Sequence, residues 1–433
     1  MESAQPIGET TASNGSLLSA VLGSFFVRLG GAATGVMLGF FFAGLHRAGL
    51  GQSSEMALSF LTAVFYLSEL VGSPICGFLV DRRGARFVLL AGPILGIISE
   101  VFLATPSHYA LLGVARLIQG LTTAFTVPAA LAYLSDATQH HPAGRGRIMG
   151  LFEVGSIGGI AVGYALGGFL WHWLHRPGFW LLAGLYTIAI GLFVFVRSDK
   201  RTTASPSPTA SFRAIGRAVD LMPSWLAINA AAGIWFGQAA YQLSGGHTRE
   251  SQLLTIGLSD VTIGTVFGIY VLLFAVGTIG WGLSLNRVGL TLPLRLGPVG
   301  MLIGAAALFE INHGVEFSGM EFGLWLAVGV VGVGVETAFT PAALTLLAAR
   351  SDVVSSGRGA VMGVYAMLLA GGQLAGTLVG GVAAAALGVD GMIIATVVVA
   401  IIGYLTLPVA AAAGASTLPS FPLGPTEQHV SAE

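Results

Sequence analysis

Seven charged side chains fall inside long apolar segments of this 433-residue chain, where a charge is energetically costly. They are Arg28, Glu69, Glu100, Arg116, Glu153, Glu310 and Glu336. A carboxyl group in a medium of low dielectric disfavours its ionised form, so it can take up and release a proton as its access to water changes. The nine histidines lie in connections and at segment ends, so proton transfer within the segments would fall to carboxylates.

The composition shows what surrounds these charges. Charged residues make up 9% of the chain, against about 25% in a soluble domain, hydrophobic residues make up 54%, and the mean hydropathy is +0.82. So few polar side chains cannot cover a water-facing surface, which excludes soluble globular and disordered proteins. A net charge of −1 also argues against a nucleic-acid partner. The composition therefore predicts an all-α polytopic protein in a lipid bilayer.

Enzymatic, nucleotide-binding and metal-binding functions lack sequence support. The chain has no Walker-type phosphate loop, and Lys200 is its only lysine. The single Cys76 excludes an internal disulfide and a cysteine-rich zinc site, and its apolar surroundings indicate a buried thiol. We therefore expect no cofactor and no metal, and transport, if it is the function, must be driven by a gradient.

Twelve apolar runs are long enough to cross a bilayer. They lie at about 17–45, 57–80, 86–104, 108–134, 147–171, 178–196, 224–243, 261–285, 291–311, 322–348, 358–387 and 390–413. The longest internal polar stretch divides them into two sets of six. The expected organisation is an N-terminal tail (1–16), a first six-helix bundle (17–197), a linker (198–223), a second six-helix bundle (224–413) and a C-terminal tail (414–433).

The basic residues predict the orientation of these spans. With the N-terminus inside, 14 of the 19 basic residues fall in inner connections, whereas outer connections hold only Arg47, Arg176 and Arg249. This excess predicts that both termini are cytoplasmic. The chain is expected to be a multi-pass protein of a plasma membrane of the bacterial inner-membrane type.

The two halves contain an internal repeat. Pro128-Ala129-Ala130-Leu131 recurs as Pro341-Ala342-Ala343-Leu344, at an offset of 213 residues. A series of span-5 glycines recurs in span 11 at the same offset: Gly159, Gly163, Gly167 and Gly168 match Gly372, Gly376, Gly380 and Gly381. Halves related in this way are the arrangement expected of a transporter with its site between them.

A ridge of small residues runs along the fifth span. Gly155, Gly159, Gly163 and Gly167 recur at every fourth position and so share one helix face. Such a ridge lets a neighbouring helix approach closely. The same pattern fits static packing or sliding between helices during a conformational change.

Three motifs resemble those of the major facilitator superfamily. The segment Gly77-Phe78-Leu79-Val80-Asp81-Arg82-Arg83-Gly84-Ala85-Arg86 resembles the family's loop signature between spans 2 and 3. Span 4 carries Arg116-Leu117-Ile118-Gln119-Gly120, which is similar to the family's R-x-x-Q-G motif. Span 5 is similar to the antiporter pattern G-x-x-x-G-P-x-x-G-G, with Tyr164 in place of the proline.

The resemblance implies a cytoplasmic gate. Its motif residues are Gly77, Asp81, Arg82, Gly84, Arg86 and Asp136. By resemblance, Asp81 would lie at the N-terminal end of span 11, where free backbone N–H groups favour an anion, and Arg86 would pair with Asp136. These contacts would hold the cytoplasmic side closed; the alternative is that the charges only set the topology.

The resemblance also sorts the intramembrane charges. In the family, spans 3, 6, 9 and 12 are peripheral, which discounts Glu100 and Glu310. The proton-coupling candidates are Glu69, Glu336, Glu153 and Arg116, each of which could alternatively form a structural pair, such as Arg28 with Glu69. Further candidates for a substrate cavity are Arg28, Gln119, Trp235, Gln238, Tyr241, Gln242, Tyr270 and Gln373. Apolar rings with a few hydrogen-bonding groups are typical of small-molecule sites.

These expectations combine into a secondary transporter that works by alternating access and is expected to be a monomer. The preferred version exports a small amphipathic or hydrophobic compound in exchange for protons. One alternative is proton-coupled uptake of a small polar or anionic solute, with Arg28 and Arg116 binding substrate. Another is a transporter-like protein that moves or senses lipid without ion coupling.

The loop signature generates a first testable prediction. Asp81→Asn removes the anion of the proposed gate, so it should lower the transport rate while leaving expression largely intact. Transport by the membrane-inserted variant, compared with wild type at equal protein amounts, measures this. A wild-type rate in the variant would remove the gating role of Asp81.

Overall fold

The protein is a bundle of long helices. A computed structural model describes residues 14–49, 54–105, 108–138, 142–196, 220–352 and 358–407. The first six helices are α1 (Asn14–Arg47), α2 (Glu55–Arg83), α3 (Ala85–Ala104), α4 (Tyr109–Ala137), α5 (Pro142–Leu174) and α6 (Gly178–Val194). The remaining elements are α8 (Met222–Leu243), the 3-10 turn η1 (Leu253–Thr255), α9 (Asp260–Val288), α10 (Thr291–His313), α11 (Gly319–Glu336), α12 (Phe339–Asp352), α13 (Arg358–Leu387) and α14 (Val389–Leu405).

These helices confirm the predicted all-α membrane fold with twelve spans. Within the described ranges, nine helical segments are long and apolar enough to cross a membrane, and α6 and α14 are shorter apolar helices. The tenth span differs from the expectation, because it is interrupted at Thr337 and Ala338 and forms two helices, α11 and α12. The predicted tail 1–16, linker 198–223 and tail 414–433 lie mostly or wholly outside the described residues, so the domain boundaries stay predictions.

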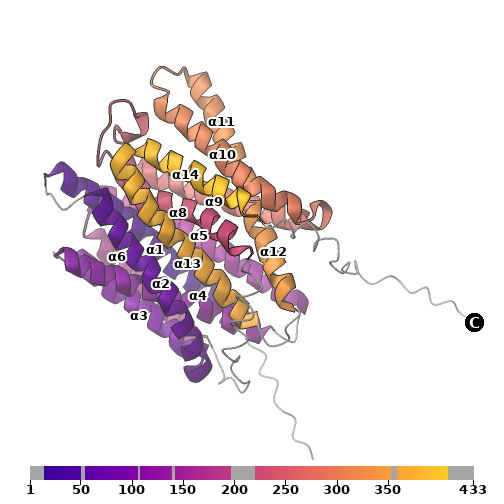
Figure 1. Cartoon of the computed structure of the whole chain (residues 1–433). Coiled ribbons are helices and arrows are strands. Elements are labelled where there is room, and N and C mark those ends of the chain that lie inside the picture. Colours follow the sequence, from indigo (N-terminus) through magenta and orange to yellow (C-terminus); the bar gives the residue numbers. More distant parts are fainter. Residues whose placement is uncertain are drawn as a thin grey trace, which may run out of the picture.

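The helices pack as two similar sets that meet along two seams. In the first set α1 packs along α5, and in the second α8 packs along α13. The seams between the sets are formed by α2 with α13 and by α5 with α9. Figure 1 shows α1, α2, α3 and α6 on one side of the bundle and α10, α11 and α14 on the other.

Glycines make the tight packing within each set possible. A Cβ atom on Gly163 would clash with the Leu29 carbonyl oxygen of α1, and a Cβ atom on Gly376 would clash with the Ala230 carbonyl oxygen of α8. The other glycines of the span-5 ridge also face α1: Gly155, Gly159 and Gly167. The repeat seen in the sequence is therefore a repeat of helix contacts, in which a smooth ridge lets two backbones approach.

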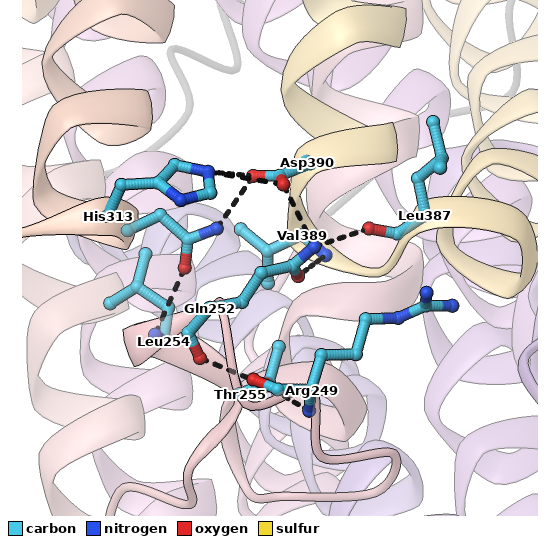
Figure 2. A network of polar contacts seen from close by, with 9 residues as sticks. Arg249, Gln252, Leu254, Thr255, His313, Leu387, Val389 and Asp390 are labelled. Carbon is cyan, nitrogen blue, oxygen red and sulfur yellow. Dashed lines mark hydrogen bonds and ion pairs between the residues drawn. The ribbon is translucent and has the colours of Figure 1, made fainter.

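The connection between α8 and α9 is fastened to the ends of three helices, as Figure 2 shows. At its centre, Asp390 at the start of α14 accepts hydrogen bonds from Asn312 Nδ2 at 2.8 Å and from Gln252 Nε2 at 3.0 Å. Gln252 also donates to the Leu387 carbonyl at 2.7 Å. These bonds satisfy polar groups at helix ends and fix the loop against the second set of helices.

The glycine ridge generates the second prediction. Gly163→Ala should lower the free energy of unfolding by about 1–3 kcal/mol, because the added methyl group forces α1 and α5 apart. Gly158→Ala on the same helix is the matched control, since its Cβ atom would only make an ordinary contact with Phe25 at 3.9 Å. Thermal unfolding of the purified proteins measures the difference. Equal stability of the two variants would contradict the tight α1–α5 contact.

Candidate functional site

Among the described residues of the first helix set, Arg116 is the most deeply buried basic side chain. It lies in α4, its exposed fraction is 4%, and its guanidinium carbon lies 4.5 Å from the centre of the Phe65 ring on α2. Its Nη1 donates a hydrogen bond to Gln119 Oε1, one turn along the same helix. A cation–π contact and an amide acceptor thus stabilise the buried cation.

Gln119 continues this chain of contacts to Glu100. The Gln119 Nε2 group donates to Glu100 Oε1 at 3.3 Å, and the Thr34 hydroxyl of α1 lies 2.7 Å from the same oxygen. Glu100 is fully buried, with an exposed fraction of 0%. Glu100, discounted by resemblance because its span is peripheral, thus points into the first helix set.

The reason lies in the face of α3 that carries Glu100. Although α3 belongs to the outer helices in the family resemblance, it packs closely on α4 and α6. The buried face of α3 includes the small residues Gly92, Gly96 and Ser99, which precede Glu100 at helical spacing. This run of small residues was the sequence signal that α3 approaches its neighbours closely and that Glu100 points inward.

A second group of charges gathers around Arg28 on α1. Its positive charge attracts the carboxylate of Glu69 on α2 and the carboxylate of Glu153 on α5. Glu69 is half-buried and Glu153 exposed, whereas Arg28 Nε is buried without a hydrogen-bond partner. Candidates for proton coupling and for the cavity from three different helices thus interact electrostatically. In the described part of the chain, none of the salt bridges joins two of them.

Glu336 belongs to the second helix set. It is the last residue of α11, next to the break that interrupts the tenth span, and it is half-buried. Its carboxyl group interacts electrostatically with the Tyr270 hydroxyl of α9. At the break the Ala338 N–H donates to the Val335 carbonyl at 3.1 Å, and the Gly334 carbonyl accepts a hydrogen bond from Trp281 Nε1 of α9 at 2.8 Å.

Aromatic rings connect the two helix sets. Tyr164 of α5 lies 5.2 Å from the Phe236 ring of α8 and 5.5 Å from the Phe267 ring of α9. Tyr270 lies 6.5 Å from Phe236 at an interplanar angle of 70°. Tyr164, which stands where the antiporter pattern has a proline, is thus part of an aromatic cluster that joins α5, α8 and α9.

Five further cavity candidates come from α8 and α13, and two of them are held by hydrogen bonds to other helices. Trp235 Nε1 donates to Thr396 Oγ1 of α14 at 2.9 Å, so its indole N–H is used in packing α8 on α14. Gln238 Nε2 donates to the Glu55 carbonyl at 2.8 Å and to Ser59 Oγ at 2.6 Å, which joins α8 to α2.

The remaining members of this set differ in their surroundings. Tyr241 is fully buried and makes an edge contact with His46 at 6.1 Å. Gln242 is fully buried, and both of its amide atoms lack a hydrogen-bond partner. Gln373 of α13 is half-buried, and its backbone is approached closely by Gly233 of α8.

The gate motif is described only in part. Gly84 has a φ of +82° and separates α2 from α3, which explains the glycine at this place in the loop signature. Arg82 lies over the Phe78 ring at 4.2 Å. The Asp81 side chain lies outside the described residues, and the pairing of Arg86 with Asp136 stays a prediction. At Gly77, the first residue of the motif, an added Cβ atom would have no other atom within 4 Å.

The acidic and histidine side chains do not form a metal centre in the part of the chain that the structure describes. No group of three or more His, Cys, Asp or Glu side chains is close enough there to hold a metal ion. Cys76 is buried, as expected for a structural thiol.

Curated relatives match about a third of this chain. Multidrug resistance protein 2 of Bacillus subtilis (strain 168) is 28% identical over 146 residues, which cover 34% of this chain and 36% of that protein. Quinolone resistance protein NorA of Staphylococcus aureus (strain Mu50 / ATCC 700699) is 28% identical over 149 residues, which cover 34% of this chain and 38% of that protein. The chain thus matches little more than a third of the length of each relative.

Solved structures share the fold over nearly the whole chain. The crystal structure of the nucleoside transporter NupG superposes with a TM-score of 0.68 at 13% identity, covering 93% of this chain and 99% of that one. The peptide transporter POT in complex with sulfate gives a TM-score of 0.66 at 15% identity, covering 93% and 95%. At such identities the likeness concerns the fold alone.

A family model extends beyond these partial matches. The model of the Major Facilitator Superfamily matches residues 20–248, more than half of the chain. This match agrees with the twelve-span fold, the loop signature and the span-4 motif. The chain therefore belongs to the Major Facilitator Superfamily and is a multi-pass membrane transporter.

Proposed function

We propose that this transporter exports a small amphipathic or hydrophobic compound in exchange for protons. The observation that carries the proposal is the aromatic cluster Tyr164, Phe236, Phe267 and Tyr270, which joins the two helix sets and has Glu336 beside Tyr270. Aromatic surface with a few ionisable groups suits drug-sized amphipathic compounds. The names of the partial relatives, which refer to multidrug and quinolone resistance, point to the same substrate class.

Exchange follows if substrate and proton compete for the same acids. Glu69 lies on α2 and Glu336 at the end of α11, each half-buried within the bundle. A substrate bearing a positive charge stabilises the ionised carboxylate, whereas a proton neutralises it. Because each then excludes the other, binding of one drives release of the other.

Alternating access is supported by close contacts at the end of each seam that carries Gly168 or Gly381. A Cβ atom on Gly168 of α5 would clash with the Asp260 carbonyl oxygen of α9, and one on Gly381 of α13 would clash with Ser59 Oγ of α2. Gln238 adds its two hydrogen bonds to α2 at the same end. With the proposed orientation this end is extracellular, so the conformation would be closed to the outside.

Proton-coupled uptake of a small anionic solute is the second candidate. It is favoured by Arg28, whose buried Nε lacks a hydrogen-bond partner and could bind a carboxylate or phosphate group. Arg116 supports this candidate less, because its Nη1 is already bonded to Gln119. The direction of proton movement distinguishes the two candidates.

The third prediction concerns that direction. In proteoliposomes with a pH indicator in the lumen, inward movement of ethidium should make the lumen more alkaline, because protons leave in exchange. Protein-free liposomes and liposomes with an ionophore that collapses the gradient are the controls. If an anionic probe acidifies the lumen instead, the result supports proton-coupled uptake. Probes that bind are identified because they raise the thermal stability of the protein. If none of these probes moves protons, both proton-coupled export and proton-coupled uptake are contradicted.

The fourth prediction assigns the coupling acids. Glu69→Gln and Glu336→Gln should each reduce ethidium-dependent proton movement to the level of protein-free liposomes, because an amide cannot exchange a proton in this way. Glu310→Gln is the matched control, since Glu310 is a half-buried acid in the last turn of α10. Full coupling in both test variants would contradict this assignment and move it to Glu153.

A further inference from the structure

Glu100 has a set of contacts that neither the family resemblance nor the proposed transport cycle uses. Its Oε1 atom lies 2.7 Å from the Thr34 hydroxyl and 3.3 Å from Gln119 Nε2. Its Oε2 atom is buried and has no hydrogen-bond partner. A fully buried carboxyl group with one satisfied and one unsatisfied oxygen requires an explanation.

The Thr34 hydroxyl allows Glu100 to exist in two protonation states. Thr34 Oγ1 lies 2.9 Å from the Gly30 carbonyl oxygen as well as 2.7 Å from Glu100 Oε1, but it has only one proton to donate. If that proton bonds to Gly30, the short contact with Glu100 requires a proton on Oε1. If it bonds to Glu100, the carboxylate can be ionised. Both states therefore fit without moving a heavy atom of Thr34.

The arrangement of the other oxygen favours the protonated state in this conformation. An ionised Glu100 would leave negative charge on Oε2 in a buried place without a donor, which is strongly unfavourable. A protonated Glu100 leaves only a neutral carbonyl-type oxygen unpaired, which costs less.

Arg116 is positioned to stabilise the ionised state after a small rearrangement. Gln119 lies between the two groups, accepting from Arg116 Nη1 and donating to Glu100 Oε1. Arg116 Nε and Glu100 Oε2 are both buried without partners. Withdrawal of the Gln119 amide would therefore allow a direct ion pair that satisfies both atoms.

The other groups around this site leave Arg116 as its only cation among the described neighbours. The Tyr186 hydroxyl of α6 forms a hydrogen bond with Gln119. The Tyr66 hydroxyl of α2 interacts electrostatically with the Arg116 guanidinium. From α1 the Thr34 hydroxyl contacts Glu100, and the Tyr164 hydroxyl of α5 also interacts with Arg116. The protonation of Glu100 thus determines whether Arg116 is held by Gln119 and Phe65 or drawn toward α3.

We propose that Glu100 is a proton-binding residue that controls the position of Arg116. In the conformation described here Glu100 carries the proton. When it passes that proton to water, its carboxylate pairs with Arg116, which leaves the Phe65 ring of α2, the helix that also carries Glu69. Proton binding at Glu100 stands on this geometry alone, whereas its link to coupling rests on the proposed proton-coupled transport.

The fifth prediction tests proton binding without a substrate. Infrared difference spectra of the protein in lipid nanodiscs, recorded over a pH series, should contain a pH-dependent C=O band of a buried carboxylic acid that is missing in Glu100→Gln. Glu310→Gln should keep this band as the matched control. Glu100→Asp, which retains an acid on the same helix face, should restore a band at a shifted position. Superimposable spectra of wild type and Glu100→Gln would overturn the proposal.

A second measurement tests the link to coupling. Glu100→Gln should retain exchange of ethidium across proteoliposomes at equal pH but lose accumulation of ethidium driven by a pH gradient. A merely structural role would reduce both equally. Gradient-driven accumulation equal to wild type, in a variant that lacks the infrared band, would overturn the link between Glu100 and coupling. It would leave the proposed export function standing, because that function is tested by proton movement in the wild-type protein.

Discussion

A charge inside a bundle of apolar helices must be matched by a partner from a neighbouring helix, because the bilayer offers no water to solvate it. This constraint accounts for much of the arrangement in the first helix set. Arg116 is placed between the Gln119 amide and the Phe65 ring, and Glu100 between Thr34 and Gln119. The same constraint makes incomplete matching informative. Where a buried oxygen or nitrogen lacks a partner, a second arrangement with a better match becomes accessible at low cost.

The close packing that brings these partners together depends on glycine. Gly163 and Gly376 let α1 approach α5 and α8 approach α13, so that the two sets acquire equivalent cores. Among the described residues, the seam between α5 and α9 uses Gly168, Gly264 and Gly268, and the seam between α2 and α13 uses Gly381. Two helix sets that meet along such seams are the architecture that rigid-body movement between two states requires.

The sequence predicts the twelve spans and the glycine ridge well, because both depend on local periodicity and hydropathy. It does not predict the break after Glu336, since the apolar run continues through Thr337 and Ala338 without a break in hydropathy. It also misplaces Glu100, because the direction in which a helix face points depends on which neighbours pack against it. Trp235 shows the same limit: its indole N–H bonds to Thr396, a partner 161 residues away that no local pattern identifies.

The central claim is that a proton gradient supplies the free energy for export, and the most direct test is thermodynamic. The steady-state ratio of ethidium across proteoliposomes can be measured at a series of imposed pH differences, with the membrane potential held at zero. The account predicts that the logarithm of this ratio rises linearly with the pH difference in the direction of exchange. A ratio that stays the same at every pH difference, in protein that still equilibrates ethidium faster than empty liposomes, would contradict it.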